Sequence, residues 1–518
     1  MPQGLWALLL ILLVVGGLWS RAELRPFNEF DQPFYLGSAY DLRHSGRFTD
    51  GYFLARPGPD RLRPSSMRFA PLYPGLLAAV AQVDSALRAN IDCLAEGDGH
   101  NPACGRAAPV MRSLQAAELV CVFWLFWWIG GAVGGTRLRA WLTLGLALLT
   151  AGVLMRSVTY LMTEMTTLWF TTAATACGLR AAQAGGSRAW GFACGVLLAL
   201  AALTRPAFEY LIFATAIAGF LAAWRARRGF GAALALVAGA ALTLAPWILR
   251  NAIMFGRPAL SFGYASHTLV QRIEFDFMTW HEYALSYVCW LPNGESLGRR
   301  IDGPAACERF GWDSPRSFYI LGHGHLLDAT LVASGGYAHH MSYLLHTYIF
   351  AMPLWHIAVT IPLALRGAYI DHWWGFVLLF VALAATVRAM LRGDWRFLLV
   401  SLPAWFMLAL NAAVAVNQTR YNLMLILPYA LAGAWVVEGA LVRKQFFFEK
   451  KNQKTFAPTL GDEQPPSVGA KVFASFFKKK RFLTSPVYLL NPVSEKPKSP
   501  SRTASSAHAS PVPDARRQ

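Results

Sequence analysis

The sequence predicts an all-helical protein that crosses a lipid bilayer many times. The chain of 518 residues is 55% hydrophobic and only 15% charged, and its mean hydropathy is +0.36. Its apolar segments approach the length of about 17–25 residues that an α-helix needs to span the hydrocarbon core. Basic residues occur in every second loop between these segments. The composition therefore indicates a polytopic membrane protein in which any soluble part is a minority.

The apolar segments define a map of the chain. We expect membrane spans near residues 4–19, 116–134, 140–156, 162–178, 189–204, 207–223, 230–249, 374–391, 397–416 and 423–441. The first segment lacks a basic n-region and a small-residue cleavage site, so we expect an uncleaved anchor and not a signal peptide. The map divides the chain into an anchor (1–20), an outer loop (21–115), six spans (116–249), a second outer loop (250–373), three spans (374–441) and a tail (442–518).

The distribution of basic residues predicts the orientation. Cytoplasmic loops of membrane proteins carry an excess of Lys and Arg. The basic loops here include "RARR" at 225–228 and "RK" at 443–444. Placing them in the cytoplasm puts both termini inside and the connections 20–115 and 250–373 outside. Segment 347–365 is long enough to span, but counting it would invert the later helices. We interpret it as interfacial or re-entrant, and a two-span insertion is the alternative.

The cysteines agree with this orientation. Two pairs lie in the outer loops, Cys93 with Cys104 and Cys289 with Cys307. An oxidising compartment permits disulfides at such positions, although free, buried thiols are the other interpretation. The other three cysteines fall in predicted spans.

Polar residues gather at the outer ends of the predicted spans. They are Asp31, Glu164, Arg205, Arg250, Asn251, Arg420 and Tyr421. Ionisable groups at the edge of the bilayer are costly and are candidates for function, although a single Arg at a span end commonly reaches to the headgroups. Because all of them share one side, the set favours a functional site at the outer face.

The order of these motifs resembles the GT-C glycosyltransferases. The motifs are D-x-x-x-Y after the first span, "PLYPGLLA", "TE", "TRP", "PWILRN" and "RY" before the last span. The closest branch is the dolichyl-phosphate-mannose–protein mannosyltransferase-like group, glycosyltransferase family 39, which includes bacterial aminoarabinose transferases. The resemblance covers residues 4 to 441. It implies a GT-C-like transmembrane helix bundle with interfacial helices in the outer loops, for which 33–46 and 71–83 are suitable.

The resemblance also implies an activity and roles for residues. The chain would be a hexosyl or pentosyl transferase that uses a polyprenyl-phosphate sugar, with Asp31 as the catalytic carboxylate in an inverting attack. Arginines bind phosphate in a bidentate manner, which suits Arg205, Arg250 and Arg420 to the donor phosphate. The substrate-binding candidates are Glu164, Tyr421, Asn251 and Arg68. Glu164 alternatively stabilises the first turn of its helix through the helix dipole.

The implied partners are a polyprenyl-phosphate sugar donor, a lipid, protein or polysaccharide acceptor, and the bilayer. The implied location is the bacterial inner membrane, with the active site facing the periplasm. One departure concerns the sugar: aminoarabinose transferases have a K-P-P motif where this chain has "MRFAPLYPG", with Ala70 at the position of the lysine and Arg68 nearby. The role of transferring a sugar to lipid A is therefore in doubt.

Other classes of function remain open at this point. A transporter or a lipid-oligosaccharide flippase has similar hydropathy, but such folds usually show repeats and charges in the middle of the bilayer. A divalent metal at the histidines of the second outer loop (His323, His325, His339, His340) is the less favoured interpretation, and no cofactor is expected with certainty.

Nucleic acid is not expected as a partner. The net charge of +18 is concentrated in residues 443–518, which hold 15 Lys/Arg against 5 Asp/Glu. This tail is Ser- and Pro-rich, so we expect disorder there. Its basic residues suit contact with anionic lipid, and a non-functional extension is the alternative.

Overall fold

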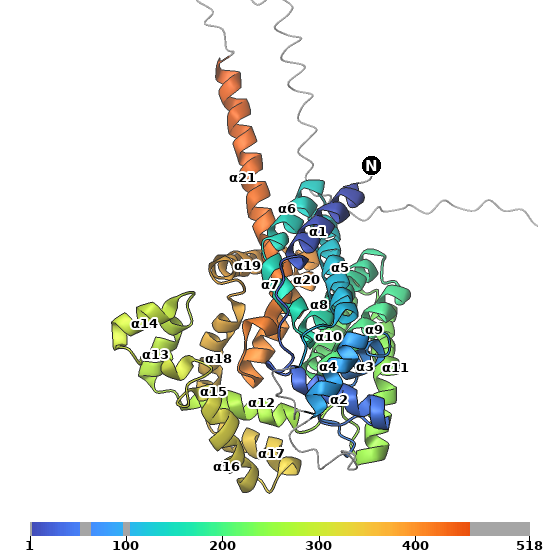
Figure 1. Cartoon of the computed structure of the whole chain (residues 1–518). Helices are drawn as coiled ribbons and strands as arrows, with labels where there is room; N and C mark the ends of the chain where they lie inside the picture. Colours follow the sequence, from blue (N-terminus) through green and yellow to red (C-terminus); the bar gives the residue numbers. More distant parts are fainter. Residues whose placement is uncertain (1–2, 52–63, 97–103, 456–518) are drawn as a thin grey trace, which may run out of the picture. The chain divides into compact units, whose positions relative to one another are not determined.

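The computed structural model describes residues 3–51, 64–96 and 104–455. The chain divides into two compact units, Met1–Phe447 and Phe448–Gln518, and the fold described below is that of the first unit. All regular elements within the described residues are helices, as Figure 1 shows. The all-helical prediction is therefore confirmed.

The apolar helices make the chain a multi-pass membrane protein by their length and composition. Six are long enough to span, or up to eight if each of two bent pairs is one span. The six are α5 (Pro109–Gly134), η1 with α10 (Pro206–Phe208, Glu209–Ala226), α11 (Phe230–Phe255), α19 (Trp373–Arg392), α20 (Trp395–Val414) and η6 with α21 (Thr419–Leu425, Ile426–Thr455). Helix α1 (Gln3–Trp19) precedes them in the chain, and α8 (Thr163–Gln183) and α9 (Arg188–Thr204) lie between α5 and α10.

Two predicted segments are broken. The segment expected as one span at 140–156 is α6 (Arg137–Leu148) followed by α7 (Ala151–Thr159), with a bend of 53°. Segment 347–365 falls largely on α18 (Pro353–Ala368), which is bent by 97° from the helix that ends at Ile349. This bend is the geometry of a broken span or a re-entrant loop, so the segment does not form one straight span.

The first outer loop forms a small helical layer. It contains α2 (Gln32–Ser45), α3 (Leu72–Val80) and α4 (Ser85–Glu96), which pack around buried residues such as Leu36, Tyr73 and Leu87. Helices α2 and α3 fall on the two segments expected to be helical, 33–46 and 71–83, and their interfacial position stays a prediction. Helix α4 is not predicted by hydropathy. The predicted disulfide Cys93–Cys104 is confirmed and joins α4 to the segment before α5.

The second outer loop is also helical. Its elements are α12 (Tyr264–Ile273), η2 (Glu274–Phe277), α13 (Trp280–Cys289), α14 (Gly294–Asp302), η3 (Glu308–Phe310), α15 (Phe318–Leu321), η4 (Gly322–Leu326), α16 (Leu327–Ala333), α17 (Tyr337–Leu344), η5 (Leu345–Ile349) and α18. The second predicted disulfide, Cys289–Cys307, is confirmed. The buried Arg272 ties this loop to the bundle, because its guanidinium donates to the carbonyl oxygens of Ala412 and His356 and pairs with Asp276.

Small residues bring α9 and α11 into close contact. A Cβ atom on Gly195 would lie 2.0 Å from the carbonyl oxygen of Leu236, and one on Gly239 would lie 2.4 Å from that of Phe192. Glycine at such crossings allows two membrane helices to approach at backbone distance. The close pair fixes the ends of both helices, where Arg205 and Arg250 lie.

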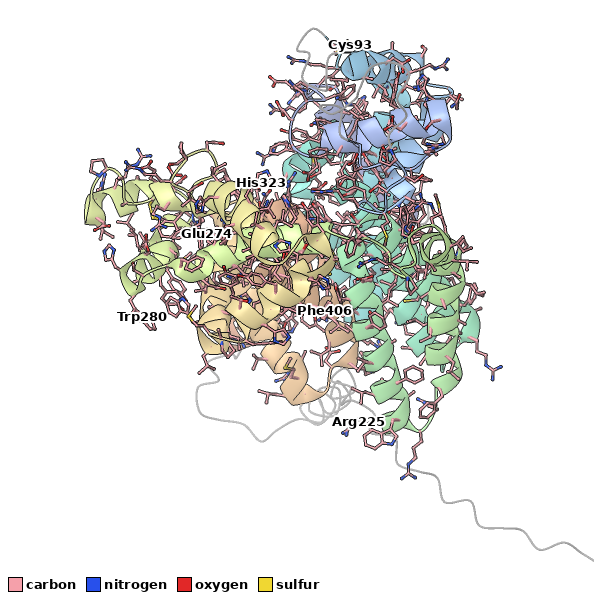
Figure 2. All side chains as sticks on the ribbon, turned by 90° about the horizontal axis from the view of Figure 1, so that it is seen from below. Cys93, Arg225, Glu274, Trp280, His323 and Phe406 are labelled. Atoms are coloured by element: carbon pink, nitrogen blue, oxygen red, sulfur yellow. A yellow bond between two sulfur atoms is a disulfide. The ribbon has the colours of Figure 1, made fainter. Side chains whose placement is uncertain are left out.

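The predicted outer loops and basic loops can be located in the structure, while the orientation itself stays a prediction. Figure 2 shows Cys93, in the first outer loop, and Arg225, in a basic loop, at opposite ends of this unit. Helix α21 continues to Thr455, so residues 442–455 form a helix where disorder was expected. The remainder of the predicted disordered tail lies outside the described residues.

Candidate active site

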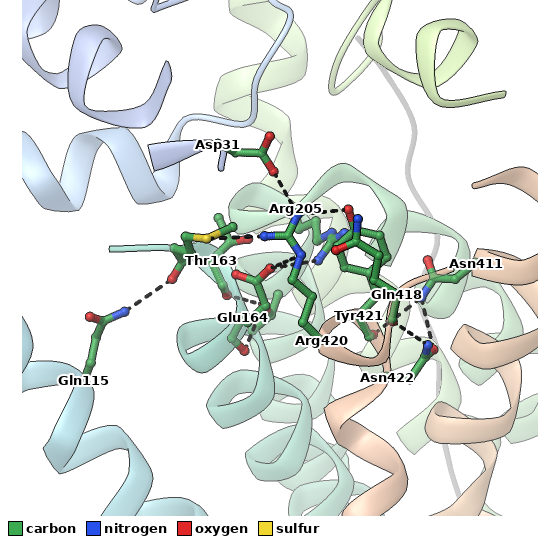
Figure 3. A network of polar contacts seen from close by, with 12 residues as sticks. Asp31, Gln115, Thr163, Glu164, Arg205, Asn411, Gln418, Arg420, Tyr421 and Asn422 are labelled. Atoms are coloured by element: carbon green, nitrogen blue, oxygen red, sulfur yellow. Dashed lines mark hydrogen bonds and ion pairs between the residues drawn. The ribbon is translucent and has the colours of Figure 1, made fainter. Parts of the chain in front are cut away.

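Asp31 directly precedes α2, but its side chain does not cap that helix. An Asp at this position usually accepts a hydrogen bond from a backbone N–H of the first turn. Here the carboxylate makes no capping bond, and Phe30 before it has a positive φ of 55°. The Asp31 side chain is 33% exposed and faces the helix bundle, as Figure 3 shows.

Gln32 determines where Asp31 lies. Its side-chain amide donates to the carbonyl oxygens of Pro26 and Glu29, and its Oε1 accepts from the backbone N–H of Leu161. Gln32 is fully buried, so these bonds are not exchanged with water. They connect the turn before α2 to the segment before α8, which brings Asp31 toward Glu164.

Glu164 lies in the first turn of α8 and is almost completely buried, with 5% of its side chain exposed. Two polar side chains of α5 support this turn: Gln115 donates to the carbonyl oxygen of Met162, and Glu118 accepts from the hydroxyl of Thr166. The position at a helix N-terminus favours a negative charge. Glu164 is therefore held as a second carboxylate at the base of the site.

Two arginines face these carboxylates. Arg420 Nη2 lies 3.6 Å from Asp31 Oδ2, and Arg420 Nε lies 3.8 Å from Glu164 Oε1. On the other side of Glu164, Arg205 Nη1 lies 3.9 Å from the same Oε1 atom. Tyr421 contacts both arginines: its hydroxyl is 3.3 Å from Arg420 Nη2, and its ring lies 4.0 Å from the Arg205 guanidinium carbon. Figure 3 shows this group of five residues (Asp31, Glu164, Arg205, Arg420 and Tyr421), called the carboxylate–arginine cluster below.

Buried amides hold the segment that carries Arg420. Asn422 donates to Asn417 Oδ1 at 2.6 Å and to the carbonyl oxygen of Gln418. Asn411 on α20 donates to Asn422 Oδ1 and to the carbonyl oxygen of Tyr421. Because all three asparagines are at most 4% exposed, η6 has a fixed position relative to α20.

The cluster lies at the junction of two cavities. The larger, of about 850 Å³, is lined by Glu164 and Arg420 and extends to the second outer loop. The smaller, of about 20 Å³, is lined by Asp31, Arg205 and again Glu164. Glu164 therefore contributes to both walls, and a substrate in the larger cavity would meet the carboxylate–arginine cluster.

Neutral phenols also border the smaller cavity, which Tyr35 and Tyr264 both line. Burial raises the pKa of Tyr35, and the nearby charges of Asp31 and Glu164 raise it further. Burial and the charge of Asp31 likewise raise the pKa of Tyr264. Both side chains therefore keep their hydroxyl protons and can donate hydrogen bonds in the smaller cavity.

The remaining predicted site residues lie elsewhere. Arg250 donates to Asn251 Oδ1 and to the carbonyl oxygen of Ser66, and its guanidinium lies over the ring of Trp247. Asn251 is fully buried and donates to the carbonyl oxygen of Ala259. Neither residue is in the wall of the two cavities described above. Arg68, in contrast, lines the smaller cavity beside Ala70.

The histidines of the second outer loop are not arranged as a metal site. Within the described residues, no three His, Cys, Asp or Glu side chains are placed to hold one ion. His340 contacts the hydroxyl of Thr330, and the ring of His323 lies against that of His267. His267, which the sequence did not single out, is nearly buried and lies near Arg68.

Sequence reasoning missed the residues that support the cluster. Gln32 is a variable position of the D-x-x-x-Y motif and carries no signal of its own. Gln115 and Glu118 have no motif around them, and their only signal is polarity within or beside an apolar segment. Polar side chains at such positions need internal partners, because water is absent. That signal was available for Gln115 and Glu118, which lie at the start of the span expected at 116–134.

No family model matches the sequence, and no curated protein matches it significantly. The chain is similar in structure to the archaeal oligosaccharyltransferase AglB from Archaeoglobus fulgidus in complex with an inhibitory peptide and a dolichol-phosphate. The two sequences are 14% identical, the match covers 93% of this chain and 54% of that chain, and the TM-score is 0.46. The chain is also similar to ArnT from Cupriavidus metallidurans bound to undecaprenyl phosphate, with 15% identity, 83% and 76% covered, and a TM-score of 0.34.

The chain spans about half the length of the oligosaccharyltransferase chains that it matches. At these identities and TM-scores the similarity concerns the fold, and the function depends on the side chains described above.

Proposed function

We propose that the chain is a GT-C-type glycosyltransferase that moves a sugar from a polyprenyl phosphate to an acceptor hydroxyl at the outer face of the membrane. The observation that carries the proposal is that the guanidinium group of Arg420 has few and weak hydrogen-bond partners. Its Nη1 faces the sulfur of Met162, which is a weak acceptor, and its Nε has no hydrogen-bond partner among the described residues. Its ion contacts to Asp31 and Glu164 are longer than hydrogen bonds. A planar fork of N–H groups held in this way suits an incoming phosphate.

The reaction assigned to Asp31 is a single displacement. The acceptor oxygen attacks the anomeric carbon of the donor sugar, and the bond from that carbon to the phosphate oxygen breaks with its electron pair. Asp31 takes or orients the proton of the attacking hydroxyl. Its partial exposure and its freedom from capping support this role, because the carboxylate is not committed to the backbone.

Arg205 and Arg420 are the residues proposed to receive the charge that develops on the leaving phosphate. They lie on either side of Glu164, which keeps both guanidinium groups at the same place before the donor binds. Preorganised donors in a site with little water stabilise a developing anion without reorganisation at the moment of reaction. Tyr421, which contacts both arginines, is proposed to fix their spacing.

The larger cavity is the proposed place of the donor. Its wall near the bundle includes Ile370 and Leu423. Apolar residues in this wall suit a polyprenyl chain, which must stay in hydrocarbon while its phosphate reaches Arg420.

The proposal changes the roles of some of the other predicted site residues and keeps those of others. Arg250 and Asn251 contact the backbone at Ser66 and Ala259, so we propose that they position the segment before Arg68 and do not touch the donor phosphate. Arg68 and Glu164 remain proposed substrate contacts because they line the smaller cavity. We further propose that the donor sugar is a hexose or a pentose. The proposed location is the bacterial inner membrane, with the site facing the periplasm.

The test is a transfer assay with the full-length chain in membranes. Several radiolabelled polyprenyl-phosphate sugars are supplied, and label in a lipid, protein or polysaccharide acceptor is measured after extraction. Transfer that is lost in an Arg420→Met, Arg205→Met double variant would support the proposal. Movement of intact donor across sealed vesicles without transfer of the sugar would instead identify a flippase, and the proposal would be wrong.

A further inference from the structure

Arg366 is a buried cation in the wall of the larger cavity and is not a member of the carboxylate–arginine cluster. It lies near the end of α18, is only 9% exposed and lines the cavity. Its Nη1 atom has no hydrogen-bond partner, and the residue makes no ion pair within 3–51, 64–96 and 104–455. Arg420 in the same cavity differs, because it already has two carboxylates nearby.

Two tryptophans hold the guanidinium of Arg366. Its central carbon lies 3.9 Å from the ring centre of Trp312 and 5.1 Å from that of Trp290, and both rings also line the cavity. Aromatic faces attract a cation and fix its plane, but they accept few hydrogen bonds. The tryptophans therefore leave Nη1 of this cavity-lining arginine without a hydrogen-bond acceptor among the described residues.

The structure also fixes Arg366 relative to Arg420. Asn417, which precedes η6, donates to the carbonyl oxygen of Leu363 on α18 and accepts from Asn422. The end of α18 packs tightly against Asn417, since a Cβ atom on Gly367 would lie 2.4 Å from its side-chain nitrogen. Both arginines thus stand on one rigid frame and face one cavity of about 850 Å³.

We infer that Arg366, between Trp290 and Trp312, binds a second anionic group of the substrates, a phosphate or a carboxylate, in addition to the donor phosphate at Arg420. A buried guanidinium without a counter-charge is costly unless a ligand supplies one. The inference rests on the proposed function, which places the first phosphate beside Asp31. The second anion has two sources: the donor, as a diphosphate, or the acceptor, as an acidic sugar or similar group.

The experiment measures binding to the purified full-length chain in nanodiscs. The probes are undecaprenyl phosphate, undecaprenyl diphosphate, galacturonate and, as the neutral counterpart, galactose. The variants are Arg366→Met, which keeps length and packing, and Arg366→Lys, which keeps the charge without the planar stacking. Arg388→Met is the matched control, because Arg388 lies 3.9 Å from the ring of Trp435 and lines neither cavity.

If the donor supplies the anion, the wild-type chain binds the diphosphate more tightly than the monophosphate. Arg366→Met then loses about 10- to 100-fold in affinity for the diphosphate only. If the acceptor supplies it, both lipids bind Arg366→Met as they bind the wild type. Galacturonate, but not galactose, then raises the unfolding temperature of the wild type and fails to do so in Arg366→Met. In either case Arg366→Lys keeps part of the effect and Arg388→Met keeps all of it.

Two results would overturn the inference. One is equal affinity of the wild type and Arg366→Met for every probe. This holds also if both Arg366 variants lose thermal stability, because the arginine would then only pack between the two tryptophans. The other is no binding of any anionic probe to the wild-type chain. Anion binding through Arg366 in a chain that transfers no sugar would instead refute the proposed function and leave this site established.

Discussion

Asp31 Oδ2 lies 3.6 Å from Arg420 Nη2, although one residue precedes the first helix of the first outer loop and the other precedes the last apolar helix. The same guanidinium lies 3.8 Å from Glu164. One cation is therefore shared by two carboxylates from different parts of the chain. A phosphate that binds Arg420 changes the surroundings of Asp31 directly, which connects donor binding to the group proposed to handle the proton.

The first prediction concerns Arg420. Arg420→Lys keeps one positive charge but loses the planar fork, so we expect weaker donor binding together with slower transfer, each by about 10-fold or more. The measurement is kcat and KM for the labelled donor. Arg250→Lys is the comparison, and it should be mild because Arg250 contacts the Ser66 carbonyl and Trp247. A stronger effect at Arg250 than at Arg420 would contradict the assignment of the phosphate site.

The second prediction concerns Asp31. Asp31→Asn keeps the shape and removes the charge, so we expect transfer to fall by about 10²–10⁴-fold with folding and donor binding nearly unchanged. Single-turnover transfer and donor binding should be measured on the same preparation. Glu29→Gln is the control, because Glu29 lies two residues away and contributes to no described cavity wall. Full activity of Asp31→Asn with loss in Glu29→Gln would assign the catalysis to the neighbour.

The sequence could predict which residues share a face, but not which of them touch. Asp31, Glu164, Arg205 and Arg420 each lie beside an apolar segment, and alternating basic loops place them on one side. The same argument included Arg250, which points toward Ser66 instead. Which way a side chain points at a helix end depends on packing such as the close contact of α9 with α11, and hydropathy does not contain that information.

Arg366 shows a second limit of what can be predicted from the sequence. It directly follows the apolar segment 347–365, where an Arg is expected to reach the headgroups. The bend of 97° before α18 and the contact with Asn417 place it in a cavity wall instead. The contact depends on Asn417, which lies beyond α19 and α20 in the chain.

The third prediction concerns the disulfide Cys289–Cys307, whose Cys289 lines the larger cavity together with the segment that follows it. Replacing both cysteines by Ala should lower stability by about 3 kcal/mol and raise KM more than it lowers kcat, because the cavity wall loosens. Steady-state kinetics and thermal unfolding would measure the two effects.

Cys93→Ala with Cys104→Ala is the matched control for the third prediction. It removes a disulfide of similar span from the other outer loop, where neither cysteine lines a described cavity. It should lower stability without the effect on KM. A rise in KM of the same size in both double variants would mean that the loss is one of general stability.

The fourth prediction concerns orientation. In a chain with Cys121 replaced by Ser, a cysteine introduced at the exposed Ser296 should react with an impermeant thiol reagent in intact cells, and one at the exposed Ala226 should not. The basic loop that holds Ala226 is expected in the cytoplasm. Labelling of Ala226→Cys alone would invert the topology and move the carboxylate–arginine cluster to the inside.

The last prediction concerns pH and His267. Burial lowers the pKa of His267 from 6.5 to about 4, and the charge of Arg68 with the neighbouring His323 and His340 adds to the effect. Because the folded chain binds this proton less readily than the unfolded chain, stability is present above pH 6.5 and is lost as the pH falls toward 4. We expect the unfolding temperature of the wild type to decrease over this range and the decrease to be smaller in His267→Asn. His325→Asn, the same change at an exposed histidine, should keep the wild-type slope. Equal slopes in all three proteins would contradict this account, because they would show that the His267 side chain is solvated in the folded chain.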